Sequence, residues 1–179
     1  MPYDIGREPI NMLILLDRSA SMSLFEFEGL RFEQVVDDAL SEVVTDPKNS
    51  GVNFGLAPFP SLQCVQGTVT RASDICYPVD EVTVPIGPDH GASIAQALDT
   101  LDTCGGAPLA GSLRWVKSYL ENSLTADLLK NPTTIVLAAD GVPNCSAGLD
   151  IDTCVNTNPD VDLSLSEQCL DDQASKDAA

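Results

Sequence analysis

Two apolar runs, each stopped by an aspartate, constrain the fold of this chain more than any other feature. Residues 10–16 (INMLILL) end at Asp17, and residues 133–139 (TTIVLAA) end at Asp140. Short continuous apolar runs are typical of strands that are buried on both faces of a parallel sheet. Both runs are therefore predicted to be buried strands with an aspartate just past their carboxyl ends.

Helical periodicity fills the stretches between these strands. Apolar residues from Leu30 to Val44 recur at helical spacing, and Asp46-Pro47 then breaks the pattern. Two later helices are expected over Ser93 to Leu101 and over Pro108 to Leu124, with Pro108 in the first turn of the second. That last helix is expected to turn four apolar side chains inward: Leu113, Val116, Leu120 and Leu124.

Further strands complete the pattern. Residues 52–60 resemble a second strand, with prolines where an edge or a strand end tolerates a missing donor, and residues 81–86 a short edge strand. A polar loop over 141–166 precedes a short helical segment. Strands alternating with helices predict an α/β fold: a doubly wound, mostly parallel sheet flanked by helices, with right-handed crossovers. The 179 residues suit a single domain over 1–179.

The charge balance excludes some classes of partner. Nine Lys and Arg face 27 Asp and Glu, so the formal net charge is -18. Such a surface repels nucleic acid phosphates and anionic lipid headgroups, and no apolar run approaches the ~20 residues of a membrane span. We expect no nucleic acid partner and no direct membrane insertion, whereas cations and basic partners fit.

Cysteine usage indicates the compartment. The chain has six cysteines and no CxxC pair, which argues against zinc ribbons and thioredoxin-like motifs and favours disulfides. Disulfides imply an extracytoplasmic location: periplasm, cell surface or medium. A cytoplasmic protein with six free thiols is the alternative. Local staples are expected in two loops, Cys104 is either unpaired or takes a remaining partner, and the pairing stays open among Cys64, Cys76, Cys104, Cys145, Cys154 and Cys169.

The residues after the first strand suit a hard cation. Asp17, Ser19 and Ser21 alternate, so in extended backbone their side chains can point to one side of the loop. Asp140 also follows a buried strand, and ligands in such sheets bind at the carboxyl ends of strands. Oxygen ligands suit Mg2+, Mn2+ or Ca2+. The simpler alternative for Asp17 to Ser21 is a strand end followed by a helix cap.

Three separated motifs, spread between about Ile10 and Gly141, resemble one known family. The apolar strand ending in DxSxS at Asp17 looks like the metal-ion-dependent adhesion site of von Willebrand factor A domains. The segment Cys104-Gly105-Gly106-Ala107-Pro108-Leu109 looks like the GGTP turn of that family, and Ala138-Ala139-Asp140-Gly141 looks like its closing aspartate-glycine.

The resemblance implies an adhesion role without catalysis. Ser19 and Ser21 would bind the ion directly, while Asp17 and Asp140 would hold it directly or through water. A protein partner would present an Asp or Glu to the remaining position, because a doubly charged ion attracts a carboxylate even on an acidic protein. A larger cell-surface or secreted assembly is expected.

The sequence departs from the family in two places. Ala107 stands where the family usually has a metal-binding threonine, so a water would have to fill that position or the affinity would fall. The chain also stops at Ala179, where the family continues with further strands. We expect a C-terminally truncated domain in which the strand 133–139 is an open edge.

Other functions fit the residues less well. A disulfide-stapled structural domain whose metal site has degenerated through Ala107 shares the predicted fold. A metal-dependent phosphotransferase would use Asp17 as nucleophile, but the second aspartate usual in such enzymes is missing from Asp17-Arg18-Ser19. No GxGxxG follows the first strand, and His90, the only histidine, is expected to be a solvated turn residue, so neither dinucleotide binding nor a catalytic triad is supported.

Overall fold

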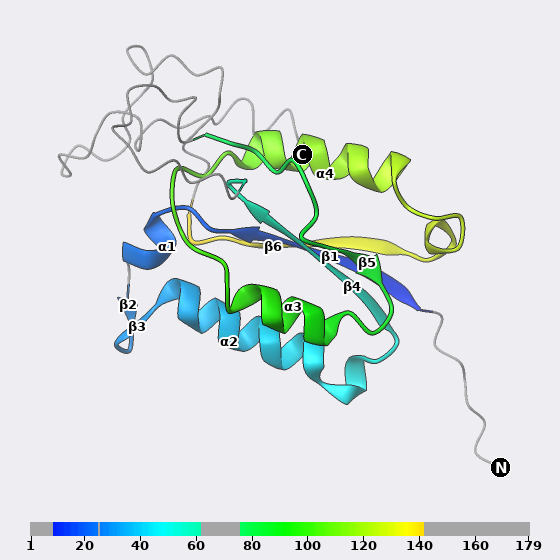
Figure 1. Ribbon diagram of the computed structural model, residues 1–179, viewed down its shortest axis with the longest axis horizontal. Helices are drawn as coiled ribbons and strands as arrows, with labels where there is room; N and C mark the ends of the chain where they lie inside the picture. Colours follow the sequence, from blue (N-terminus) through cyan, green and yellow to red (C-terminus); the bar gives the residue numbers. More distant parts are fainter. Residues whose placement is uncertain (1–8, 25, 62–75, 142–179) are drawn as a thin grey trace.

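A sheet of four strands in the order β5-β4-β1-β6 forms the centre of the described part of the protein (Figure 1). The computed structural model describes residues 9–24, 26–61 and 76–141. Its strands are β1 (Ile10–Asp17), β4 (Val52–Phe59), β5 (Val84–Gly87) and β6 (Thr133–Ala138). Strands β4 and β6 both run parallel to β1, and β5 is antiparallel to β4. The expectation of a mostly parallel sheet is confirmed.

Helices cover both faces of this sheet, as a doubly wound fold requires. Figure 1 shows α4 (Leu109–Asn122) on one face, with α2 (Phe32–Thr45) and α3 (Gly91–Leu98) on the other. Two short 3-10 turns complete the described connections: η1 (Pro47–Asn49) and η3 (Leu128–Lys130).

Strand β1 supplies alternate side chains to two cores. Leu13 and Leu15 pack in a cluster under α4, and Ile14 and Leu16 pack in a second cluster against α2 and α3. All four side chains are at most 1% exposed, which explains why this strand is apolar at nearly every position. The inward-facing residues expected on the last helix, Leu113, Val116, Leu120 and Leu124, all contact the first cluster.

Helices α2 and α3 approach each other at a glycine. A Cβ at Gly91 would overlap the carbonyl oxygen of Val44, so the first turn of α3 can lie against the end of α2 only without a side chain there. This contact brings the α2–α3 layer together beneath β1 and β4.

The first predicted helix begins later than expected. Leu30 belongs to β3 (Leu30–Arg31), which pairs antiparallel with β2 (Glu26–Phe27), and α2 begins at Phe32. The connecting residues Glu28 and Gly29 have φ of 54° and 84°, values that suit a two-residue hairpin turn. The apolar residue at position 30 fits the helical period, but the local turn at Glu28-Gly29 decides its structure.

The prediction that residues 133–139 are buried is wrong. Side chains of β6 are half-buried or exposed, with Ile135 at 37% and Leu137 at 44% exposure. Within the described residues β6 pairs only with β1, so its place at the sheet edge is the reason. Apolar composition indicates that a segment is a strand, but it does not say whether the strand lies in the middle of the sheet.

Cysteine pairing is described in part. Cys76 and Cys104 are each in a disulfide bond, so of the two alternatives for Cys104 the structure has the paired one. Cys64, Cys145, Cys154 and Cys169 lie outside the described residues, as do the polar loop 142–166 and the short helical segment expected after it. In the ranges that are described, no helix is long and apolar enough to cross a membrane.

Candidate metal centre

Parallel pairing brings the two aspartates to one edge of the sheet. Leu16 of β1 lies opposite Ala138 of β6, so Asp17, the last residue of β1, and Asp140, which follows β6, lie at neighbouring strand ends. Figure 1 shows α1 (Ser21–Leu24) at this same end, where β1 and β6 finish. The topology therefore places Asp17, Asp140 and Ser21, the first residue of α1, at the same end of the sheet.

A chain of hydrogen bonds links all four predicted site residues. The Ser19 amide donates to Asp17 Oδ1 at 2.8 Å, and the hydroxyls of Ser19 and Ser21 are 3.0 Å apart. Ser21 Oγ donates to Asp140 Oδ1 at 3.1 Å. Their side-chain oxygens thus form one contiguous group that joins residues more than a hundred positions apart in sequence.

Burial sets the electrostatics of this group. Asp17 is 1% exposed, and loss of hydration raises its pKa from an ordinary value of 3.8 to about 6. Hydrogen bonds from Ser19 lower the pKa of Asp17, and the nearby charge of Asp140 raises it again. A buried carboxylate beside a second carboxylate is costly unless positive charge compensates it.

The residues fit a hard divalent cation. Asp140 Oδ2 is buried and has no hydrogen-bond partner among the described residues, and buried polar atoms of this kind call for an explanation such as an ion or a water. The assembled side chains offer carboxylate and hydroxyl oxygens, which Mg2+, Mn2+ and Ca2+ prefer. The described ranges contain no group of three or more His, Cys, Asp or Glu side chains that could hold a metal, so an ion at this site would depend on the serine hydroxyls as well as on the two carboxylates.

The glycine turn lies against the loop of Asp17 to Ser21. Ala20 N donates to the Gly105 carbonyl at 3.0 Å, and Cys104 N donates to the Arg18 carbonyl at 2.8 Å. Gly105 has φ of 71°, a conformation that favours glycine. Ala107 is 6% exposed and belongs to the core cluster under α4. This turn supports the loop by its backbone, and Ala107 brings no side-chain oxygen to it.

Sequence reasoning missed Arg18. A charged residue at this position is expected to point into water, yet the side chain is 1% exposed and bonds to Asp37 of α2. The only available signal was its position between two site residues. His90 also differs from expectation: it is half-buried, and its Nδ1 lies 2.7 Å from the Pro85 carbonyl oxygen. Glu26 and Glu28 are exposed on the β2–β3 hairpin.

Comparison with known proteins finds similarity in structure. No protein-family model and no curated protein matches the sequence. The pilus adhesin SpaC from Lactobacillus rhamnosus GG matches 78% of this chain at 24% identity, with a TM-score of 0.54. The open conformation of SpaC matches 78% of the chain at 23% identity, with a TM-score of 0.52. The vWF domain of the type V pili tip protein Mfa5 from Porphyromonas gingivalis matches 85% at 14% identity, with a TM-score of 0.51.

These neighbours show the fold and no more. The chain spans 16% and 15% of the two SpaC chains and 45% of the Mfa5 chain. The mostly parallel sheet with helices on both faces is therefore of the von Willebrand type.

Proposed function

We propose that this protein is a cation-dependent adhesion module in which Asp17, Ser19, Ser21 and Asp140 hold Mg2+, Mn2+ or Ca2+. The observation that carries the proposal is the contiguous group of side-chain oxygens, closed by the hydrogen bond from Ser21 to Asp140. When bound, the ion supplies positive charge at a site that otherwise gathers two carboxylates. Ser19 and Ser21 present their hydroxyls to it, and Asp17 and Asp140 balance its charge directly or through water.

The partner in this proposal is a protein that presents an Asp or Glu side chain. With a net charge of -18, the surface as a whole repels an acidic partner, so binding to a carboxylate depends on the ion. A partner with basic groups around that carboxylate fits best, since these would be attracted by the acidic surface. We expect no enzymatic turnover at this site.

An extracytoplasmic location is consistent with this role. Disulfide bonds at Cys76 and Cys104 would persist only in an oxidising compartment. The structural neighbours include a pilus adhesin and a pilus tip protein, which supports a place in a surface or secreted assembly. Mass spectrometry of the protein, alkylated without reduction, tests the disulfides: free thiols at both positions would contradict them.

Cation binding is the first test of the proposal. Isothermal titration of Mg2+, Mn2+ and Ca2+ into chelator-stripped protein should give saturable binding to one site, abolished or strongly weakened in Ser19→Ala and Ser21→Ala. Ser23→Ala is the matched control, because Ser23 Oγ bonds the Ala20 carbonyl within the same segment and is not assigned to the ion. Its affinity should equal that of the wild type. A folded wild type that binds none of the three ions contradicts the proposal.

Partner chemistry is tested by a pair of peptide libraries. One library carries a fixed Asp or Glu at its centre, and the other carries Asn or Gln at the same position. Retention of the acidic library in Mg2+, lost in EDTA and absent for the amide library, is the expected result. Equal retention of both libraries would contradict recognition of a carboxylate through the ion.

A structural role with a degenerate site is the second candidate, because Ala107 is buried and brings no oxygen. It predicts a folded protein whose melting temperature is the same in Mg2+ and in EDTA. The adhesion proposal predicts a higher melting temperature in Mg2+, because an ion that binds only the folded state stabilises it.

A further inference from the structure

Arg18 carries a permanent charge inside the protein. It stands between Asp17 and Ser19, and its side chain is 1% exposed. Burying a guanidinium is costly unless its charge is paired and its N–H groups are hydrogen-bonded. Arg18 Nε is buried without a hydrogen-bond partner among the described residues, so the compensation is incomplete.

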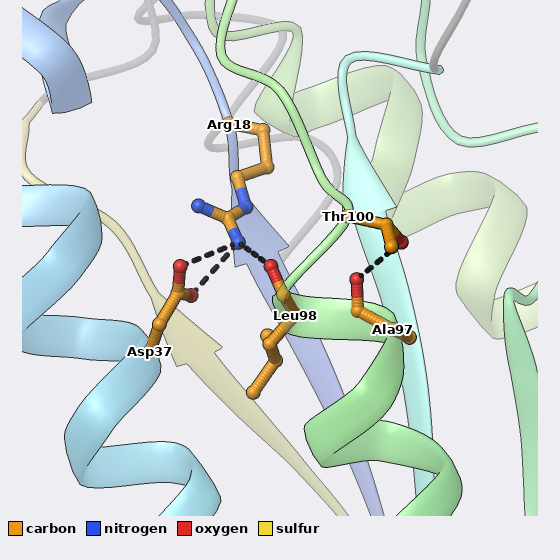
Figure 2. A network of polar contacts seen from close by, with 5 residues as sticks. All are labelled: Arg18, Asp37, Ala97, Leu98 and Thr100. Carbon is orange, nitrogen blue, oxygen red and sulfur yellow. Dashed lines mark hydrogen bonds and ion pairs between the residues drawn. The ribbon is translucent and has the colours of Figure 1, made fainter.

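The side chain connects three elements. Figure 2 shows the guanidinium directed at Asp37 of α2 and at the Leu98 carbonyl, which ends α3. Arg18 Nη2 lies 2.8 and 2.9 Å from the two carboxylate oxygens of Asp37, and 3.5 Å from the Leu98 carbonyl oxygen. The loop after β1 is thereby tied to both helices on one face of the sheet.

The backbone of the same residue is equally engaged. Arg18 N donates to the Phe59 carbonyl of β4 at 2.6 Å, and the Arg18 carbonyl accepts from Cys104 N at 2.8 Å. Both the side chain and the backbone of Arg18 are therefore held, by contacts to Asp37, Leu98, Phe59 and Cys104. Because Arg18 is covalently joined to Asp17 and Ser19, the same contacts limit how far these two site residues can move.

Stability alone explains this pair poorly. The Arg18 side chain is 1% exposed and that of Asp37 is 24% exposed, so the pair has lost most of its hydration. An ion pair in such a place is often no better for stability than a well-packed apolar pair of similar volume, because desolvation offsets the attraction. Burial raises the pKa of Asp37 even though Arg18 opposes that shift, which agrees with a costly environment. An ion pair does, however, fix direction, because it requires a particular orientation of both partners.

We infer that Arg18 is a positioning residue: its ion pair with Asp37 holds the loop of Asp17 to Ser21 in the geometry that binds the cation. This inference rests on the proposed cation site. On this inference α2 supports cation binding through Asp37, although none of the proposed ion ligands lies on that helix. Loss of partners that orient metal ligands typically weakens metal affinity by about 10- to 100-fold, and we expect that range here.

A double variant distinguishes an effect of the ion pair on loop geometry from an effect on the stability of the fold. Arg18→Met with Asp37→Leu replaces the ion pair by an apolar pair in the full chain, and we expect a melting temperature near that of the wild type. Titration of Mn2+ should nevertheless show about 10- to 100-fold weaker binding. Asp38→Asn is the matched control, because Asp38 is the exposed neighbour of Asp37 on the same helix, and its affinity should be unchanged. Wild-type affinity in a stable double variant would overturn the inference.

A second measurement needs no cation. Amide hydrogen exchange in chelator should be at least about tenfold faster at Ser19 and Ala20 in Asp37→Asn, which leaves side-chain shape unchanged, while Leu13 to Leu16 exchange as in the wild type. Unchanged exchange at Ser19 and Ala20 would overturn the inference, and it decides the question if the double variant does not fold. If the wild type binds no cation, the proposed function fails, and these exchange rates still decide whether Arg18 positions the loop.

Discussion

Strands β1 and β6 each lead to an aspartate of the candidate centre, yet they hold these aspartates in different surroundings. Asp17 ends a strand in which the side chains of Leu13 to Leu16 are at most 1% exposed, and the Ser19 amide donates to its carboxylate. Asp140 follows an edge strand in which Ile135 is 37% and Leu137 44% exposed. One carboxylate is thus built into the core, whereas the other reaches the site from the periphery. Two apolar runs that look alike in sequence can therefore contribute differently to the free energy of unfolding.

Truncation in the two strands tests this difference with the largest expected effect. Leu15→Ala should lower the free energy of unfolding by about 2 to 5 kcal/mol, because it opens a cavity in a closed core. Leu137→Ala, at a side chain that is 44% exposed, should cost less than about 1 kcal/mol. Urea unfolding followed by circular dichroism measures both. Equal losses would mean that β6 is covered as fully as β1.

The aspartates themselves are compared by removing one charge at a time. Asp17→Asn and Asp140→Asn should each weaken Mg2+ binding by more than about 100-fold, since a ligand contributes more than the groups that orient it. Without the ion the two variants should diverge. Asp17→Asn should raise the melting temperature by about 2 to 4 °C or more, because a buried charge is removed, and Asp140→Asn should change it less. Calorimetry in EDTA resolves this, and an unchanged Asp17→Asn variant would contradict the costly burial of Asp17.

The pH dependence of ion binding isolates Asp17. Protons and the cation compete for its carboxylate, so Mg2+ affinity should fall by about tenfold per pH unit below about 6, where the pKa of Asp17 lies. In EDTA, where no ion binds, a lower pH has the opposite effect: it stabilises the folded protein. The folded-state pKa lies above the ordinary value of 3.8, so protonation favours the folded protein and the cost of burying Asp17 declines as the pH falls through 6.

Asp17→Asn is the control for this pH effect. Burial also raises the pKa of Asp37, which gives a contribution of the same sign in EDTA. The part of the pH dependence that the variant removes therefore belongs to Asp17. Titrations at pH 7, 6 and 5 that give one affinity would contradict proton competition at this residue.

The smallest effect concerns Ala107. If the site is only one oxygen short, Ala107→Ser should strengthen Mg2+ binding severalfold, by about 1 kcal/mol, without loss of fold. Ala110→Ser is the control, because Ala110 is also buried, at the start of α4. Unchanged affinity in Ala107→Ser would show that position 107 does not face the ion.

Much of the fold could be predicted because it depends on local pattern. The apolar runs predicted the strands, and helical periodicity predicted α2, α3 and α4. The inward face of α4 was correct at Leu113, Val116 and Leu120, whereas Leu124 contacts the same cluster from beyond the end of the helix at Asn122. The start of α2 could not be predicted, because the Glu28-Gly29 turn competes with helical periodicity at Leu30. The apolar run alone predicted a buried β6, whereas the family resemblance predicted an open edge; within the described residues β6 lies at the edge of the sheet, and its side chains are correspondingly exposed.

The sequence by itself determined the class of fold and the residues of the candidate centre. Apolar runs that alternate with helical periods predicted the fold, and two such runs stopped by Asp17 and Asp140, with two hydroxyls at alternate positions, predicted the candidate centre. The tertiary structure alone decided which charges are buried. Arg18 is buried and pairs with the half-buried Asp37 because the loop after β1 lies against α2, and Asp17 has a raised pKa because it is buried at the end of β1. Burial and ion pairing depend on what surrounds a side chain in space, and residues distant in sequence supply those surroundings.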